Sequence, residues 1–203
     1  MAAIEPGKIR NIAVVGHRGT GKTSLVEALL FQTGEVNRLG TIEAGTTVSD
    51  SDEDEQRRAV SISLSLTHTD WQGRKINLVD CPGDPSFQGE ARCALRVVDG
   101  ALVVVSAVMG FEVGTARVKK LAEELGLARV LVVNMLDRER ADFFRTLGQI
   151  QDQFSSKCVA VHIPIGAEHE LEGIVDVLHM CAYMNPEGQK EADPVPISDS
   201  MAD

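Results

Sequence analysis

Residues 16–24, GHRGTGKTS, have the types and spacing of a loop that binds phosphate. They follow the apolar run NIAVV, and the pattern G-x-x-x-x-G-K-[ST] is met by Gly16, Gly21, Lys22 and Thr23. Backbone N–H groups of such a loop, with the N-terminus of the next helix, surround an anion. Lys22 would neutralise β- and γ-phosphates, and the Thr23 hydroxyl suits Mg²⁺. The predicted nucleotide-binding residues here are Gly16, His17, Arg18, Gly19, Thr20, Gly21, Lys22, Thr23 and Ser24.

A second motif lies in INLVDCPG, where Asp80 ends an apolar run and Gly83 follows three residues later. The spacing D-x-x-G places the carboxylate near the water shell of a metal ion. It also places the Gly83 amide where it can bond a γ-phosphate, and that contact exists only while the phosphate does. Such an arrangement is a switch. Taken in isolation, DCPGD is equally compatible with an ordinary turn after a strand.

A third motif, in VLVVNMLD, indicates which base the site would read. The run ends with Asn134, Met135 and Asp137. A carboxylate at Asp137 can accept hydrogen bonds from both N1–H and N2–H₂ of guanine, whereas adenine offers no such pair of donors. A buried Asp facing adenine would stay unpaired at a cost of several kcal/mol. The third motif therefore predicts guanine, and Asn134, Met135 and Asp137 join the predicted nucleotide-binding residues.

Strands that alternate with helices position these motifs. Apolar runs predict strands over 10–15, 60–68, 76–80, 101–108, 128–134, 158–166 and 173–184, with 101–108 and 128–134 buried on both faces. Helical spacing predicts helices over 22–32, 89–98, 111–126 and 141–154. Residues 34–59 are expected to be a long loop, and the chain from Asn185 onward a polar loop or tail. Alternation of this kind predicts an α/β fold, in which ligands bind at the carboxyl ends of parallel strands.

Composition narrows the classes of function. The chain has 203 residues and a net charge of −10, which disfavours independent binding to DNA or RNA over a broad surface. No apolar run is long enough to span a bilayer, and the N-terminus lacks the core of an export signal. The four cysteines (81, 93, 158 and 181) show no paired spacing, so we expect reduced thiols in a cytoplasmic protein. Histidines 162, 169 and 179 fit no metal-ligand pattern.

The three motifs, in this order and spacing, resemble the translational GTPases and, more narrowly, elongation factor G. The resemblance covers nearly the whole chain and rests on GHRGTGKTSLVEALL, DCPGDPSFQGE, VVNMLDRERADFFRTLGQI and IPIGAEHELEGIVDVLHMCAY. It implies a P-loop NTPase three-layer αβα domain with a mostly parallel sheet, plus the start of a small β-rich insertion. Residues 1–157 would be the GTP-binding P-loop domain, and 158–203 the beginning of the insertion subdomain and a polar tail. The implied cofactors are GTP and Mg²⁺, and the implied partner is the ribosome, reached through domains largely absent from this chain.

The sequence departs from the family pattern at three positions. Met135 stands where the family has Lys, and its stem can still cover the base. Ser61, in RAVSI, stands where the family has the Mg²⁺-binding Thr and keeps the hydroxyl, so the implied metal ligands are Thr23, Ser61 and Asp80. Asp84 stands where the family has a water-orienting His, so Asp84 and Lys22 are the candidate catalytic residues. The family's last guanine-contacting loop is not found, and we expect the chain to be the N-terminal part of a longer factor.

These features predict a GTP-binding switch domain of an elongation factor G-like translation factor, most similar to a divergent paralogue. Binding of GTP would depend on Mg²⁺, and hydrolysis to GDP would be slow or dependent on the ribosome, because a carboxylate at Asp84 faces an anionic γ-phosphate. The alternative is a GTP-binding regulatory or ribosome-rescue module that does not hydrolyse GTP. A P-loop ATPase is a third interpretation, which Asn134 and Asp137 disfavour.

Overall fold

The computed structural model describes residues 4–184 and 192–197, which form two compact units. The first unit runs to Val105 and also includes Glu112–Val132, and the second comprises Ser106–Phe111 and the chain from Val133 onward. Each unit is described by itself below. The predicted domain boundary between residues 157 and 158 remains a prediction.

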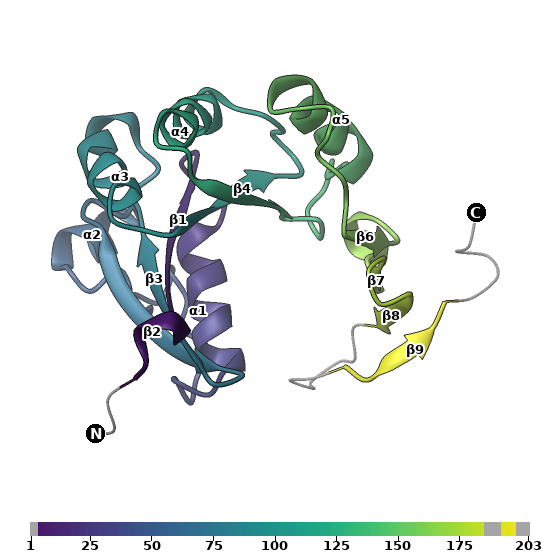
Figure 1. Ribbon diagram of the computed structural model, residues 1–203, viewed down its shortest axis with the longest axis horizontal. Helices are drawn as coiled ribbons and strands as arrows, with labels where there is room; N and C mark the ends of the chain where they lie inside the picture. The colour runs from purple at the N-terminus through teal and green to yellow at the C-terminus, as the bar shows by residue number, and fades with distance from the viewer. Residues whose placement is uncertain (1–3, 185–191, 198–203) are drawn as a thin grey trace. The chain divides into compact units, whose positions relative to one another are not determined.

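A five-stranded sheet forms the centre of the first unit, in the order β2-β3-β1-β4-β5 (Figure 1). Strand β1 (Ile9–Gly16) is parallel to both of its neighbours, β3 (Arg74–Asp80) and β4 (Gly100–Ser106). Strand β2 (Ser65–Trp71) is antiparallel to β3, and β5 (Ala128–Asn134) is the other edge strand. Because Val14 pairs with Asp80 and Gly16 with Val104, the loops that follow β1 and β3 leave the same edge of the sheet.

Helices cover both faces of this sheet, which confirms the predicted αβα architecture. Helix α1 (Lys22–Gln32) packs on β1 and β3, where Val26 and Leu30 bury themselves against Val14, Leu78 and Val104. The alternate residues of β1, which point to the opposite face, include the fully buried Ala13 and Val15. Helices α3 (Gln88–Leu95) and α4 (Val113–Glu124) also pack on β1.

The second unit holds α5 (Phe143–Gln153) and an antiparallel sheet in the order β6-β7-β8-β9. Its strands are β6 (His162–Ile165), β7 (Gly173–Asp176), β8 (Cys181–Met184) and β9 (Pro194–Pro196). Ile150 of α5 is buried, and Phe154 packs edge-to-face on Phe111 with ring centroids 5.6 Å apart. The side of α5 that carries Ile150 is therefore a packing surface.

The strand predicted over 60–68 is wrong at its first half, since β2 begins only at Ser65. Two buried or partly buried carboxylates accept hydrogen bonds from backbone N–H groups that would otherwise pair with a neighbouring strand. The N–H groups of Ile62 and Ser63 both donate to Glu55 Oε1, at 2.8 and 3.0 Å, and Leu64 N–H donates to Glu90 Oε2 at 3.2 Å. Glu55 belongs to a short helix, α2 (Glu53–Arg58), inside the segment predicted to be loop.

Three further expectations need correction. Strand β5 is not buried on both faces, because it is an edge strand and Val130 is 60% exposed. The run 173–184 divides into β7 and β8, since Asp176 caps an intervening turn through the N–H groups of Leu178 and His179. Within the predicted tail, β9 pairs with β8, whereas residues 185–191 and 198–203 lie outside the described residues. In the part of the chain that the structure describes, no helix is long and apolar enough to cross a membrane.

Candidate nucleotide site

The glycine-rich loop connects β1 to α1 in the first unit. Gly16 ends the strand with φ +150°, and a Cβ at this position would collide with the carbonyl oxygen of Val104 on β4. Gly21 precedes the first helical residue in the left-handed region, with φ 84°. The loop can therefore lie against the sheet and then turn into the N-terminus of α1 only with glycine at both positions.

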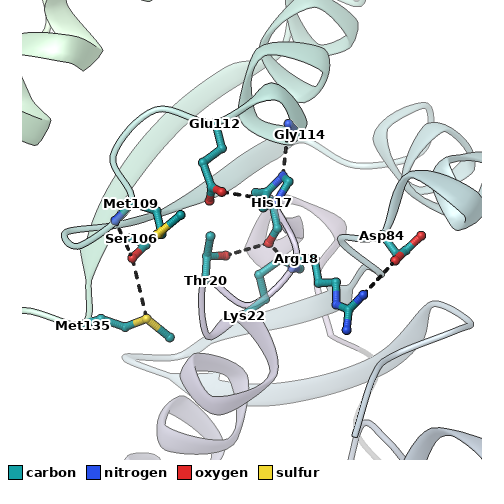
Figure 2. A network of polar contacts seen from close by, with 10 residues as sticks. All are labelled: His17, Arg18, Thr20, Lys22, Asp84, Ser106, Met109, Glu112, Gly114 and Met135. Carbon is teal, nitrogen blue, oxygen red and sulfur yellow. Dashed lines mark hydrogen bonds and ion pairs between the residues drawn. The ribbon is translucent and has the colours of Figure 1, made fainter. Parts of the chain in front are cut away.

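Lys22 and Thr20 hold the loop closed from inside (Figure 2). Both are buried, and both donate to the carbonyl oxygen of His17, Lys22 Nζ at 2.9 Å and Thr20 Oγ1 at 3.0 Å. Burial lowers the pKa of Lys22, and the nearby carboxylate of Asp80 opposes that shift. The loop thus presents a cation whose charge is only partly compensated by its neighbours.

The side chain of His17 positions the loop and does not line the cavity described below. Its Nδ1 accepts from the backbone N–H of Gly114 at 3.2 Å, and its Nε2 lies 3.3 Å from Glu112 Oε1 (Figure 2). A Cβ at Gly114 would collide with the imidazole. The beginning of α4 is thereby fixed against the phosphate loop, and only the backbone of His17 remains available to a ligand.

The three implied metal ligands, Thr23, Ser61 and Asp80, come from three different segments. The hydroxyl oxygens of Thr23 and Ser61 lie 3.3 Å apart. Asp80 is 2% exposed and neither of its carboxylate oxygens has a hydrogen-bond partner among the described residues. Burial raises its pKa to about 6, while the hydroxyls of Thr23 and Ser49 and the charge of Lys22 oppose the rise.

These residues fit Mg²⁺. Hard oxygen ligands suit this ion, and a buried carboxylate without partners is the group that a bound cation would stabilise. No three His, Cys, Asp or Glu side chains gather as a metal site anywhere in 4–184 or 192–197, so the hydroxyls of Thr23 and Ser61 are essential to the assignment.

Asp50 is a site residue that the sequence analysis missed. It is 5% exposed, and burial raises its pKa, whereas a hydrogen bond from Ser61 lowers it. It lies among the acidic residues of SDSDEDE, and nothing in that run distinguishes it from the exposed Asp52, Glu53 and Asp54. Only the folded loop places its carboxylate beside Ser61.

A cavity of about 430 Å³ opens over the loop within the first unit. Its walls bring together predicted residues from the first motif, from the second motif and from the segment around Ser61. The lining residues are Arg18, Gly19, Gly21, Lys22, Thr23, Ile42, Asp50, Arg58, Ala59, Val60, Ser61, Gly83 and Asp84. Three cations and two carboxylates line it. In a chain with a net charge of −10, this wall is locally positive. A second hollow, beside the β2–β3 turn, contains none of the predicted site residues.

Gly83 joins the second motif to the first. A Cβ at this position would meet the backbone nitrogen of Arg18 at 2.7 Å and would collide with Lys22 Nζ. The backbone after Asp80 therefore lies directly against the phosphate loop, as the spacing D-x-x-G requires. Ser24, in contrast, is exposed on α1 and does not line the cavity.

Asp84 is fixed by contacts on both of its carboxylate oxygens. Oδ1 accepts from the backbone N–H of Ser86 at 2.9 Å, and Oδ2 lies 3.5 Å from Arg18 Nη1 (Figure 2). The hydrogen bond from Ser86 and the charge of Arg18 lower the pKa of Asp84 below its ordinary value. The carboxylate is therefore ionised at neutral pH.

The third motif belongs to the second unit, where Met135 has φ 64° and its sulfur accepts from the hydroxyl of Ser106 at 3.8 Å (Figure 2). The carbonyl oxygen of Asn134 accepts from Ala107 N–H at 2.8 Å. Asp137 is exposed, with its Oδ2 3.7 Å from Arg138 Nε. Within this unit the turn is well defined, and the role of Asn134, Met135 and Asp137 in reading the base remains a prediction.

Two histidines of the second unit lie beside the carboxylate of Asp176. His179 Nδ1 lies 2.7 Å from Asp176 Oδ2, and His162 Nε2 lies 3.8 Å from the same oxygen. His169 lies apart, in the short helix Glu168–Glu170.

Comparison with known proteins identifies the family to which the chain belongs. The model of the elongation factor Tu GTP binding domain matches residues 7–196. A crystal structure of a protein from Thermus thermophilus is similar to this chain with a TM-score of 0.89 and 35% sequence identity, over 95% of this chain and 29% of that one. The chain thus spans less than a third of the length of that protein. Because the family model covers most of the sequence, the chain belongs to the family of the elongation factor Tu GTP binding domain.

Proposed function

We propose that the chain is the GTP-binding switch domain of an elongation factor G-like translation factor, and that it binds GTP together with Mg²⁺. The observation that carries this proposal is the buried carboxylate of Asp80, whose oxygens make no well-formed hydrogen bond although the hydroxyls of Thr23 and Ser49 and the charge of Lys22 act on it. The hydroxyl of Thr23 lies in turn beside that of Ser61. These groups come from three separate segments of the first unit. A purely structural role leaves the burial of an unpaired carboxylate unexplained.

Each motif has its own part in binding. The backbone N–H groups of residues 18–24 and the ammonium of Lys22 bind the β- and γ-phosphates. Thr23, Ser61 and Asp80 hold Mg²⁺, which supplies positive charge to the phosphate oxygens. The amide of Gly83 binds the γ-phosphate, and its close approach to Arg18 and Lys22 supports this role. Asp137 accepts from guanine, so that GTP is preferred to ATP.

Hydrolysis of GTP to GDP and phosphate is proposed to be slow in the isolated chain. In this reaction water attacks the γ-phosphorus, the bond to the oxygen bridging β and γ breaks, and the water loses a proton. Asp84 is a poor acceptor for that proton, because its pKa is lowered by Ser86 and Arg18. Its negative charge also opposes orientation of water beside an anionic phosphate. Faster hydrolysis would need groups from a partner, and the ribosome is the partner that we propose, in the cytoplasm.

The second candidate is a GTP-binding module that does not hydrolyse GTP. The contact between Asp84 and Arg18 favours it, because the charge of Arg18 helps to keep this carboxylate ionised and therefore a poor acceptor for a proton from water. Single-turnover hydrolysis with and without ribosomes, for the wild type and for Asp84→His, separates the two candidates. Fast turnover by the native chain alone would contradict both.

Nucleotide binding is the primary test of the proposal. Calorimetric titrations with GTP, GDP and ATP in Mg²⁺ buffer should show tight binding of both guanine nucleotides and weak binding of ATP. Lys22→Ala should abolish binding of both guanine nucleotides. Asp137→Asn should weaken the binding of GTP and strengthen the binding of xanthosine triphosphate, because the 2-oxo group of xanthine accepts a hydrogen bond. Tighter binding of ATP than of GTP would overturn the proposal.

A further inference from the structure

The guanidinium of Arg18 lies at the end of the cavity where the two phosphate-binding motifs meet. Arg18 lines the 430 Å³ cavity together with Gly83 and Asp84. Its backbone nitrogen is so close to Gly83 that a Cβ there would meet it at 2.7 Å. The side chain of Arg18 lies 3.5 Å from the carboxylate of Asp84, the residue that follows Gly83, whose amide is the proposed ligand of the γ-phosphate. Figure 2 shows it extended toward Asp84.

The contact between Arg18 and Asp84 is weak enough to be exchanged. Their nearest nitrogen and oxygen atoms lie 3.5 Å apart, and the side chains are 59% and 20% exposed. Exposed ion pairs of this kind contribute little to stability, because water screens both charges. A guanidinium binds phosphate oxygens through two parallel N–H groups, which is a stronger arrangement than a single contact with a carboxylate.

We infer that Arg18 is a specificity-determining residue that binds the γ-phosphate, and that Asp84 competes with this phosphate for the guanidinium. This inference rests on the proposed function and adds a second cation, besides Lys22, to the recognition of a triphosphate. Arg18 then distinguishes GTP from GDP, because GDP has no γ-phosphate. Asp84 acts on the nucleotide through Arg18 and is a positioning residue.

The charges of the cavity fit this role. Lys22 is buried and its Nζ is bound to the carbonyl oxygen of His17, so it approaches the phosphates from inside the loop. Arg18 is long and largely exposed, so it reaches the terminal phosphate from the outer side. A triphosphate carries more charge than a diphosphate, and a second cation at its terminal end increases the affinity for GTP selectively.

Arg18→Met tests the inference, because it keeps most of the side-chain stem and removes the charge. By calorimetry, the affinity for the non-hydrolysable analogue guanosine β,γ-imidotriphosphate should fall about tenfold, the loss expected for one charge-assisted contact. The affinity for GDP should change less than about twofold, since the lost contact involves only the γ-phosphate. Arg74→Met, at the start of β3 and outside this cavity, is the matched control and should leave both affinities unchanged.

A double-mutant cycle tests the part assigned to Asp84. Asp84→Asn alone should strengthen binding of the triphosphate analogue, because the guanidinium is released and a negative charge is removed. In the Arg18→Met background the gain should be smaller, since no guanidinium remains to be released. Additive effects would overturn the role of Asp84.

The outcomes separate this inference from the proposed function. If the wild type binds no guanine nucleotide, both fail. If the wild type binds both nucleotides, and Arg18→Met weakens both equally or neither, the proposed function stands and Arg18 does not read the γ-phosphate. A loss confined to the triphosphate supports the inference, because a merely structural role would affect GDP as well.

Discussion

The hydroxyl of Thr23, in the first turn of α1, lies 3.3 Å from the hydroxyl of Ser61, which is 38 residues further along the chain. Between these two residues the chain passes through α2 and the loop that carries Asp50. The contact therefore fixes a long segment against the phosphate loop. It also joins Ser61 to Thr23, whose hydroxyl acts on the buried carboxylate of Asp80, and the proposed Mg²⁺ site depends on these three groups.

Substitution of Ser61 should uncouple nucleotide binding from Mg²⁺. In Ser61→Ala the affinity for GTP in Mg²⁺ buffer should fall about tenfold toward the value measured in EDTA, because one metal ligand is lost. Ser61→Thr should retain the dependence, since it keeps the hydroxyl. Ser63→Ala, an exposed neighbour, is the control. Equal Mg²⁺ dependence in Ser61→Ala and the wild type would remove Ser61 from the site.

Asp80→Asn should stabilise the chain in Mg²⁺-free buffer and weaken its binding of GTP. The carboxylate is buried and makes no well-formed hydrogen bond, and burial raises its pKa to about 6 although Thr23, Ser49 and Lys22 oppose the rise. Replacing it with a neutral side chain should increase the free energy of unfolding at neutral pH by on the order of 1–3 kcal/mol.

The raised pKa of Asp80 also predicts how the stability of the chain changes with pH. A carboxyl group whose pKa is higher in the folded chain binds a proton preferentially in that state, so the folded state loses stability as pH rises from its ordinary pKa through about 6. Between about pH 5 and pH 7 the free energy of unfolding, measured with urea, should fall by about 1 kcal/mol more in the wild type than in Asp80→Asn. Parallel pH profiles for the two proteins would show that Asp80 is not the group responsible.

Gly83→Ala should damage both stability and binding. The added Cβ would meet the backbone of Arg18 and His17 and collide with Lys22 Nζ. Overpacking of this kind lowers the free energy of unfolding by about 1–3 kcal/mol. Displacement of Lys22 should weaken the binding of GTP and of GDP alike.

Gly89→Ala is the matched control for Gly83→Ala, since nothing lies within 4 Å of its added Cβ and the residue belongs to α3. It should raise the free energy of unfolding by about 0.5–1 kcal/mol, through helix propensity. A Gly83→Ala protein as stable and as active in binding as the wild type would show that the two loops are not in close contact.

The elements that the sequence predicted well are those set by local pattern. The loop from Gly16 to Thr23 and helix α1 follow from glycine spacing and helical periodicity, and β4 follows from a continuous apolar run. The parallel register of β1 and β3 then brings Asp80 to the same edge of the sheet as Gly16. Pattern alone therefore predicted the mostly parallel αβα fold.

Tertiary contacts decided the rest. Residues 60–64 alternate as a strand does, but the N–H groups of residues 62–64 donate to the carboxylates of Glu55 and Glu90. Asp50 becomes a cavity residue only because the loop folds back on Ser61. The role that we infer for Arg18 rests on its distance to Asp84, which no spacing in the sequence indicates.

Glu27 provides the last prediction, because it ties the segment before α2 to α1. It is 1% exposed, and its two carboxylate oxygens accept from the N–H groups of Gly40 and Val48, at 3.1 and 3.0 Å. In Glu27→Gln one oxygen becomes an NH₂ group that faces an N–H donor. The buried donor then has no acceptor, which should lower the free energy of unfolding by about 1–3 kcal/mol.

The same change should release the segment locally before the whole chain unfolds. Cleavage by trypsin after the exposed Arg38 should become faster in Glu27→Gln, because proteolysis samples local opening and the loop has lost one of its two anchors on α1. Glu43→Gln, an exposed position in the same segment, should be cleaved at the wild-type rate. Equal cleavage rates in all three proteins would mean that Glu27 is not what holds this segment against the phosphate loop, and that the contact between Thr23 and Ser61 suffices.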